Sequence, residues 1–203
     1  MLKIRLIVSL ITSLIIVMHT QPASAQSGVN DLDSALLTLG DLPPGWLASF
    51  PGEQGAYSTT RCGQDLTVLY PTIARQFKRS ELGPGLIHEI VIVPPGEGEA
   101  VMASQRERLG ACPEWVTTQA GRPTLRWQGA RIPLPEIADE AFAFRSVAPM
   151  LLVGQATGDH VTLRSGDIFN LVTYASVGTH DTGALELYAR IAAAKLAVKL
   201  SGS

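Results

Sequence analysis

The sequence has few basic residues once its N-terminal segment is set aside. The first 25 residues carry 2 of the 16 Lys and Arg and none of the 18 Asp and Glu, so the remainder has 14 basic residues and a formal net charge of −4. The only lysines in that remainder are Lys78, Lys195 and Lys199. Because nucleic-acid binding draws on basic side chains that neutralise phosphates, the composition argues against nucleic acid as a partner.

Long hydrophobic runs are also missing. The longest apolar stretch, Leu6–Met18, has about 13 residues, fewer than the ~20 that a helix needs to cross a bilayer. Lys3 and Arg5 precede this stretch, and an A-x-A sequence follows it at 23–25. These three parts together are typical of a secretory signal peptide.

The signal peptide assigns a compartment to the rest of the chain. We predict cleavage after Ala25, with residues 1–25 as the signal peptide and 26–203 as one secreted or extracytoplasmic domain. No cysteine lies near the cleavage point, so the lipid attachment of bacterial lipoproteins is not expected. The alternative is that the apolar segment is retained as a membrane anchor.

Cysteine is scarce as well, with 2 residues in the whole chain. In an oxidising compartment such a pair is normally joined, so we expect a Cys62–Cys112 disulfide. It would close a loop of about 50 residues and contribute roughly 4 kcal/mol. A metal site needs further ligands at suitable spacing, whereas His88, His160 and His180 are scattered, so we expect no metal.

Motifs of the common catalytic sites are absent. The chain has no G-x-S-x-G, G-x-x-x-x-G-K-[ST], H-E-x-x-H or G-x-G-x-x-G sequence. Asp159 is followed by His160, and His180 by Asp181, but neighbours along a chain rarely face each other, and the members of a triad meet through the fold. We expect both histidines on surface loops, with no cofactor and no enzyme activity.

A pair of adjacent carboxylates, Asp139 and Glu140, lies at the expected start of a strand. Paired carboxylates serve acid–base catalysis in some enzymes. We interpret this pair instead as a turn cap followed by an exposed acid.

Apolar spacing and capping residues predict three helices. The first, 31–39, would place Leu32, Leu36 and Leu39 on one face, and the second would run from Glu97 or Glu99 to about Ala111. The third is expected from Asp181 or Thr182 to about Leu200, with one face made of Ala184, Leu187, Tyr188, Ile191, Ala194 and Val198.

Alternating and β-branched residues predict strands through most of the remaining chain. Two hairpins are expected, one from 72–80 and 86–93 and the other around the turn at 165–167. Further strands are indicated by EWVTTQ, PTLRWQG and EAFAFRSV, whereas residues 148–158 fit either a strand or a long loop. Since no repeated βαβ pattern appears, we predict an α+β fold: a mostly antiparallel sheet with packing helices near the N-terminus, the middle and the C-terminus.

The stretch LGDLPPGW at 39–46 combines rigid and permissive residues. Pro43 and Pro44 fix two φ angles, and Gly45 supplies conformational freedom just before Trp46. We expect the turn to direct Trp46 into the core, with ligand stacking as the alternative.

Several of these separated features together resemble a known family. They are ALLTLGDLPPGW at 35–46, Cys62, Cys112, IADEAFAFR at 137–145, VTLRSGDIFNLV at 161–172 and the final AAAKLAVKL. In this combination the chain resembles the PknH-like extracellular (sensor) domain family of bacterial envelope proteins. The resemblance implies helices around a mostly antiparallel sheet, a solvent-facing cleft for an unidentified ligand, and no known catalysis.

The chain departs from the kinase-linked members of that family. It has one cysteine pair where they have two, no kinase domain, and no transmembrane segment beyond the signal peptide. We therefore expect a stand-alone binding protein that acts at the bacterial cell envelope.

Three hypotheses of function follow. The first is a secreted, non-enzymatic ligand-binding or sensor-like domain for a small or envelope-derived molecule, with Trp46, Trp115, Arg126 and Trp127 as candidate lining. Aromatic rings supply contact area, and an arginine can pair with carboxylate or phosphate. The second is a small secreted hydrolase built from a histidine and Asp or Ser neighbours, and the third is an interaction module for another envelope protein.

Overall fold

The computed structural model describes most of the chain after the first 30 residues. The described residues are 31–49, 57–61, 64–65, 70–80, 83–119, 124–138, 140–150 and 154–202. The expected signal peptide and Cys62 lie outside them, so signal-peptide cleavage and the Cys62–Cys112 disulfide stay predictions. No helix among the described residues is long and apolar enough to cross a membrane.

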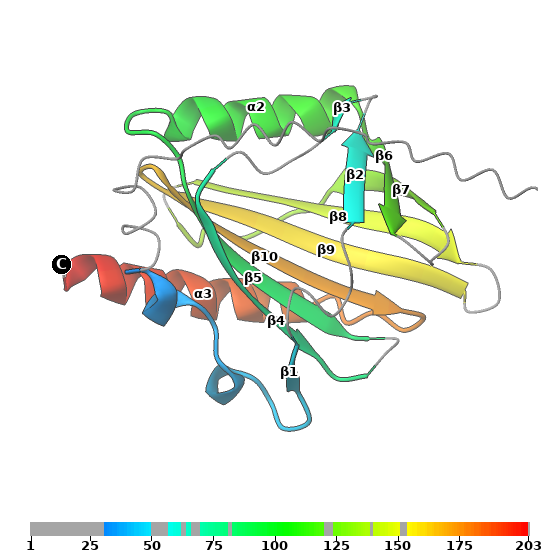
Figure 1. The fold of residues 1–203 in the computed structure, drawn as a ribbon, viewed down its shortest axis with the longest axis horizontal. Helices are drawn as coiled ribbons and strands as arrows, with labels where there is room; N and C mark the ends of the chain where they lie inside the picture. The colour runs from blue at the N-terminus through cyan, green and yellow to red at the C-terminus, as the bar shows by residue number, and fades with distance from the viewer. Residues whose placement is uncertain are drawn as a thin grey trace, which may run out of the picture.

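One antiparallel sheet forms the centre of the molecule (Figure 1). Its ten strands follow the order β1-β4-β5-β10-β9-β8-β7-β6-β2-β3, and every neighbouring pair is antiparallel. The strands are β1 Leu47–Ser49, β2 Tyr57–Arg61, β3 Gln64–Asp65, β4 Thr72–Lys78, β5 Gly85–Ile92, β6 Glu114–Gln119, β7 Leu125–Arg131, β8 Glu140–Met150, β9 Gly154–Ser165 and β10 Ile168–Val177. The α+β class and the antiparallel sheet are therefore confirmed.

Two α-helices cover opposite faces of this sheet (Figure 1). α2 spans Gly98–Ala111 and α3 spans Ala184–Ser201. Side chains alternate between the faces of a strand, so on β10 Val172 packs with α3 while Phe169 packs with α2. We call these two surfaces of the sheet the α3 face and the α2 face.

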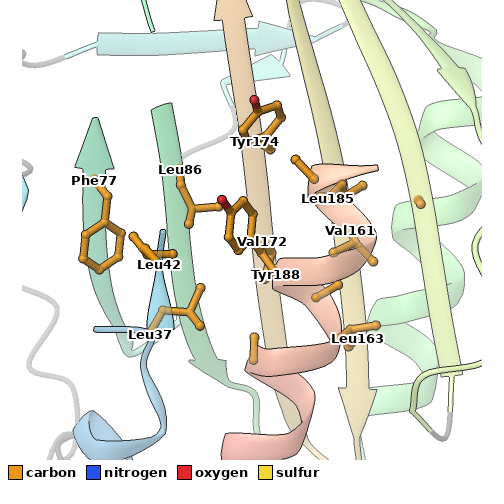
Figure 2. Close-up of a cluster of buried hydrophobic side chains, with 14 of the residues drawn as sticks. Leu37, Leu42, Phe77, Leu86, Val161, Leu163, Val172, Tyr174, Leu185 and Tyr188 are labelled. Atoms are coloured by element: carbon orange, nitrogen blue, oxygen red, sulfur yellow. The ribbon is translucent and has the colours of Figure 1, made fainter. Parts of the chain in front are cut away.

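The core under α3 is the larger of the two (Figure 2). Figure 2 shows Leu86 from β5 and Val172 from β10 beside Tyr188 of α3, and Val161 from β9 near Leu185. Burying such large apolar side chains stabilises a fold by about 1.5–3 kcal/mol each. The sheet and α3 thus share one hydrophobic core, which supports the polar side chains of the α3 face.

The face of α3 that is buried differs from the expected one. Leu187 and Val198 are 51% and 72% exposed, whereas Leu185, Ala192 and Leu196 are buried. The prediction of a face through Leu187 and Val198 was wrong because apolar residues surround much of this helix. Two different sets of apolar residues therefore fit the helical period, and contact with the sheet decides which set is buried.

The N-terminal helix expected at 31–39 is replaced by two 3-10 turns, η1 Asp33–Ala35 and η2 Leu39–Asp41. Leu36 between them has an extended backbone, and the N–H of Leu37 bonds to a histidine of β5 instead of continuing a helix. Leu36 and Leu37 are both fully buried. An extended stretch can bury two successive leucines among different neighbours, whereas a helix would turn one of them outward.

The turn after η2 directs Trp46 into the core, as expected. Gly45 has a φ of 97°, a conformation that L side chains rarely adopt. Trp46 is 7% exposed, and its ring meets Tyr188 of α3 edge-on at 6.0 Å. The rigid turn therefore fastens the N-terminal segment to the last helix.

The segment left open at 148–158 belongs largely to strands. Its first residues complete β8 and its last residues open β9, and Pro149 pairs with Gln155. The expected hairpin at 165–167 is confirmed, and its Gly166 has a φ of 61°. These long central strands carry the polar side chains described next.

Candidate ligand cleft on the α3 face

A cleft lies on the α3 face where β6, β7 and β8 run side by side. Its volume is about 430 Å³, within the range of small-molecule sites. The residues that line it are Pro113, Glu114, Gln128, Gly129, Ala130, Ile132, Arg145 and Val147. The cleft thus combines small and apolar side chains with one cation, one carboxylate and one amide.

Arg145 is the best-anchored polar group of the cleft. Its Nε and Nη2 atoms donate to the two carboxylate oxygens of Asp159 at 2.6 and 2.7 Å. The Asp159 side chain is 0% exposed, whereas that of Arg145 is 31% exposed. Such a two-bond pairing holds the guanidinium in one orientation while part of it faces the solvent.

The charges of this pair support each other. The hydrogen bond to Asp159 raises the pKa of Arg145 above its ordinary value. Burial opposes the ionisation of Asp159, but the hydrogen bonds from Arg145 and His180 outweigh it and hold the pKa of that carboxyl below its usual range. Both groups are therefore charged at neutral pH.

A second contact connects Asp159 to the segment before α3. Nε2 of His180 lies 3.0 Å from an Asp159 carboxylate oxygen, and Nδ1 lies 2.9 Å from the Ser176 hydroxyl. The sequence pairs His180 with Asp181 and Asp159 with His160, but the fold joins His180 to Asp159 instead. Arg145, Asp159, His180 and Ser176 make one connected network from the cleft to the end of β10.

The network contains the residue types of a serine hydrolase, but its geometry differs from that of a working triad. Ser176 is 6% exposed and the His180 side chain 8%, so neither presents an open reacting atom. Both carboxylate oxygens of Asp159 are bound by Arg145, which already neutralises the charge. The arrangement is therefore well suited to holding Arg145 and the connection to α3 in place.

His160 belongs to a separate group on the α2 face. Its Nε2 lies 2.9 Å from the Ser146 hydroxyl and its Nδ1 lies 3.1 Å from that of Thr173. The ring stacks on Phe144 at 4.4 Å. The prediction of a loop position was wrong, because His160 lies in the middle of the long strand β9.

Glu140 also differs from the expectation of an exposed acid. Its side chain is 20% exposed and forms ion pairs with Arg106 of α2 and Arg164 of β9. Its expected partner Asp139 lies outside the described residues. In this position Glu140 fastens α2 to the sheet.

The structure separates the residues proposed to line a ligand site. Trp46 lies in the core under α3. Trp115 and Trp127 stack on each other on the α2 face, with ring centroids 6.3 Å apart and planes 14° apart. Arg126 is exposed on the α3 face of β7, next to the cleft but not among its lining residues. The fold does not bring the four residues together.

The residues that build the cleft, Arg145 above all, were missed from the sequence. On β8 the residues facing α3 are Ala141, Ala143, Arg145 and Val147. A single arginine among small apolar residues on one side of a strand indicates a charge that points toward the core. Such a charge is expected to pair with a buried carboxylate. That signal was present in EAFAFRSV, but the partner lies on the next strand.

A second depression, of about 530 Å³, lies beside the C-terminal turns of α3. Its lining consists of Ser34, Ala194, Lys195, Val198, Lys199 and Gly202. Lys195 is bound to Asp41 at 2.8 Å. Although this depression is larger, it has no buried charged group to orient a ligand, so the Arg145 cleft is the stronger candidate. Among the described residues, no three His, Cys, Asp or Glu side chains gather as metal ligands.

Comparison with known proteins supports the fold. No protein-family model matches the sequence, and none of the curated proteins matches it. The structure is similar to the extracellular domain of PknH from Mycobacterium tuberculosis, with a TM-score of 0.57 and 12% sequence identity, over 88% of this chain and 97% of that one. This likeness shows that the chain has the fold of that extracellular domain, and the expected resemblance is confirmed at the level of the fold.

Proposed function

We propose that this protein is a non-enzymatic, sensor-like domain outside the cytoplasm that binds a small ligand in the Arg145 cleft. The single observation that carries the proposal is the guanidinium of Arg145, fixed by a fully buried carboxylate and still partly open to the cleft. A fixed cation loses little freedom when a ligand binds, and this preorganisation favours affinity.

The proposed location rests on two independent observations. The first 25 residues have the three parts of a secretory signal peptide. The fold is similar to that of a domain described as extracellular. In such a compartment the 2 cysteines would form a disulfide, which would connect the end of α2 to the segment around residue 62.

Native mass spectrometry of the purified protein with an extract of its own cell envelope tests the proposal. We expect a discrete added mass on the unmodified protein. Arg145→Lys keeps a positive charge for Asp159 but loses the planar fork, and it should weaken retention of that mass by about tenfold or more.

Arg126→Ala is the matched control for this experiment. It also changes an arginine on the α3 face, but the residue lies outside the cleft lining. The added mass should persist in this variant. Equal retention by Arg145→Lys and the unmodified protein would contradict a site at Arg145, and loss only in Arg126→Ala would move the site along β7.

A small secreted hydrolase is the second candidate function. The observation that favours it is the chain of contacts from Ser176 through His180 to Asp159. A fluorophosphonate probe would label Ser176 of such an enzyme and would fail to label Ser176→Ala. We expect no labelling of either protein, because the hydroxyl is buried.

A further inference from the structure

The Arg145 cleft presents opposite charges at separate positions. Arg145 of β8 supplies the cation and Glu114 of β6 the carboxylate. Gln128 of β7 lies between them, and its amide donates to Glu114 at 3.3 Å. Ala130 and Val147 provide apolar surface beside these groups. A ligand that matches this pattern has two charged ends and a less polar centre.

The strand register sets the spacing between the backbone positions of Glu114 and Arg145. Glu114 pairs with Gln128, Gln128 pairs with Val147, and Arg145 is two residues along β8 from Val147. Two strand spacings and a two-residue offset place the two backbone positions roughly 12 Å apart. Both residues belong to the α3 face, so their side chains approach the same cleft from its two ends.

Both charged groups retain capacity for a ligand. Arg145 uses Nε and Nη2 for Asp159, and its Nη1 has no hydrogen-bond partner among the described residues. Glu114 is exposed, and only one of its oxygens receives the Gln128 amide. An incoming carboxylate can therefore accept from Arg145, and an incoming ammonium can donate to Glu114.

From this placement we infer that the cleft binds a short zwitterionic peptide of about three residues. Its C-terminal carboxylate pairs with Arg145 and its N-terminal ammonium with Glu114. Three extended residues span about 10 Å, a length comparable to the roughly 12 Å between the backbone positions of the two charged residues. The inference rests on the proposed function, because it names the ligand class of the same cleft.

The two ends of the ligand contribute unequally. Arg145 is half-buried and rigidly held, so its charged hydrogen bond to a carboxylate should raise affinity by about tenfold or more. Glu114 is exposed, and exposed ion pairs contribute little, so the ammonium should raise affinity by about twofold to fivefold. The difference gives a distinct order of affinities for peptides blocked at one end.

Isothermal titration calorimetry of the purified full chain with trialanine tests the inference. The probes are the free peptide, its N-acetylated form, its C-terminal amide and the form blocked at both ends. We expect affinity to fall by about threefold on acetylation and by at least about tenfold on amidation. Equal binding of all four forms, or no binding of the free peptide, would overturn the inference.

The proposed function and this inference fail in different ways. If trialanine does not bind but the envelope extract still adds a mass that depends on Arg145, the cleft is a ligand site for another class of molecule. If neither the peptide nor the extract yields a bound species, the proposed ligand-binding function itself fails.

A pair of matched variants assigns the ammonium end. Glu114→Gln should abolish the difference between free and N-acetylated trialanine and preserve the preference for a free carboxylate. Glu107→Gln makes the same charge change at an exposed position on α2 and should bind like the unmodified protein. Loss of the N-terminal preference in both variants would show a general effect of charge and contradict the assigned contact.

Discussion

The two faces of the sheet differ in the partners that they provide for neighbouring polar residues. On β9, Asp159 belongs to an ionic network on the α3 face, whereas His160 on the α2 face bonds to two hydroxyl groups and stacks on Phe144. On β5, His88 is fully buried toward α3, and Glu89 next to it lies partly buried on the other face.

This difference explains how a charged arginine can be held in the cleft on the α3 face. The α3 face contains paired charges and hydrogen bonds from one element to the next, which orient the cleft arginine. The α2 face has aromatic side chains in stacked, edge-on and tilted contact, and its Glu140 ion pairs with Arg106 and Arg164 fasten α2 to the sheet instead of lining a cleft. An unpaired buried charge is costly, so the face that carries the cleft cation also has to carry its partner.

The largest expected effect on this comparison comes from breaking the ionic network. Arg145→Leu leaves the buried Asp159 with only His180 as a partner, and removing one member of a buried pair costs about 3–5 kcal/mol. Urea denaturation should show this loss in the free energy of unfolding. The double variant Arg145→Leu/Asp159→Leu should recover a large part of it, since no charge is then stranded.

The exposed Arg126→Ala provides the scale for that measurement and should change stability by no more than about 0.5 kcal/mol. If Arg145→Leu is as stable as Arg126→Ala, the ionic network of Arg145 and Asp159 does not stabilise the α3 face, which would contradict the comparison.

Acidification should weaken the α3 face next. Burial, with the nearby charges of Lys195 and Arg75, lowers the pKa of His88 from 6.5 to about 4, although the Asn170 hydrogen bond and Asp41 favour the charged form. Between these pH values the unfolded chain binds a proton that the folded protein does not, so the free energy of unfolding falls as pH drops. By about pH 4 the loss reaches about 3 kcal/mol.

His88→Gln isolates this contribution in urea denaturation at about pH 7 and about pH 4. The carboxylates Asp41 and Asp159, whose pKa values are lowered in the fold, also lose stabilising contacts in acid. They do so in both proteins, so the difference between the two pH profiles reports His88. If both proteins lose the same free energy of unfolding between the two pH values, His88 has the same pKa in the folded and unfolded states, which would contradict the prediction.

The smallest effect is expected on the α2 face, with the opposite sign. Burial raises the pKa of Glu89 above its ordinary value of 4.5, so the folded protein holds this proton more tightly than the unfolded chain. The contribution of Glu89 to the free energy of unfolding therefore falls as the pH rises above 4.5, the ordinary pKa of the group. Glu89→Gln should raise the melting temperature at neutral pH, and the gain should shrink toward about pH 4.

Glu107→Gln, on the exposed surface of α2, is the control for the loss of one negative charge. A gain of the same size in both variants would attribute the effect to net charge and not to the burial of Glu89.

Much of the fold could be predicted because its signals are local. The end of α2 is marked by Pro113 two residues after Ala111, and the hairpin of β9 and β10 by a Gly-containing turn. By contrast, β2 and β3 were missed, and the N-terminal helix was wrong because η1 and η2 take their positions from contacts with β5 and α3.

The candidate site was much less predictable. Trp115 and Trp127 were expected at a ligand, but in the fold they stack on each other with Phe144 near the first ring. Aromatic content alone does not separate a core from a binding surface. Arg145 carried the stronger signal, a charge at an inward position of an alternating strand.

The sequence by itself determined where most strands and both long helices lie, because alternation, helical period and turn residues act over a few positions. Only the tertiary structure decided which polar residues meet. Arg145 reaches Asp159 because β8 pairs with β9, and His180 joins them because the chain returns past the end of β10. Such contacts depend on strand order and on which face each helix covers, and these are properties of the packed whole.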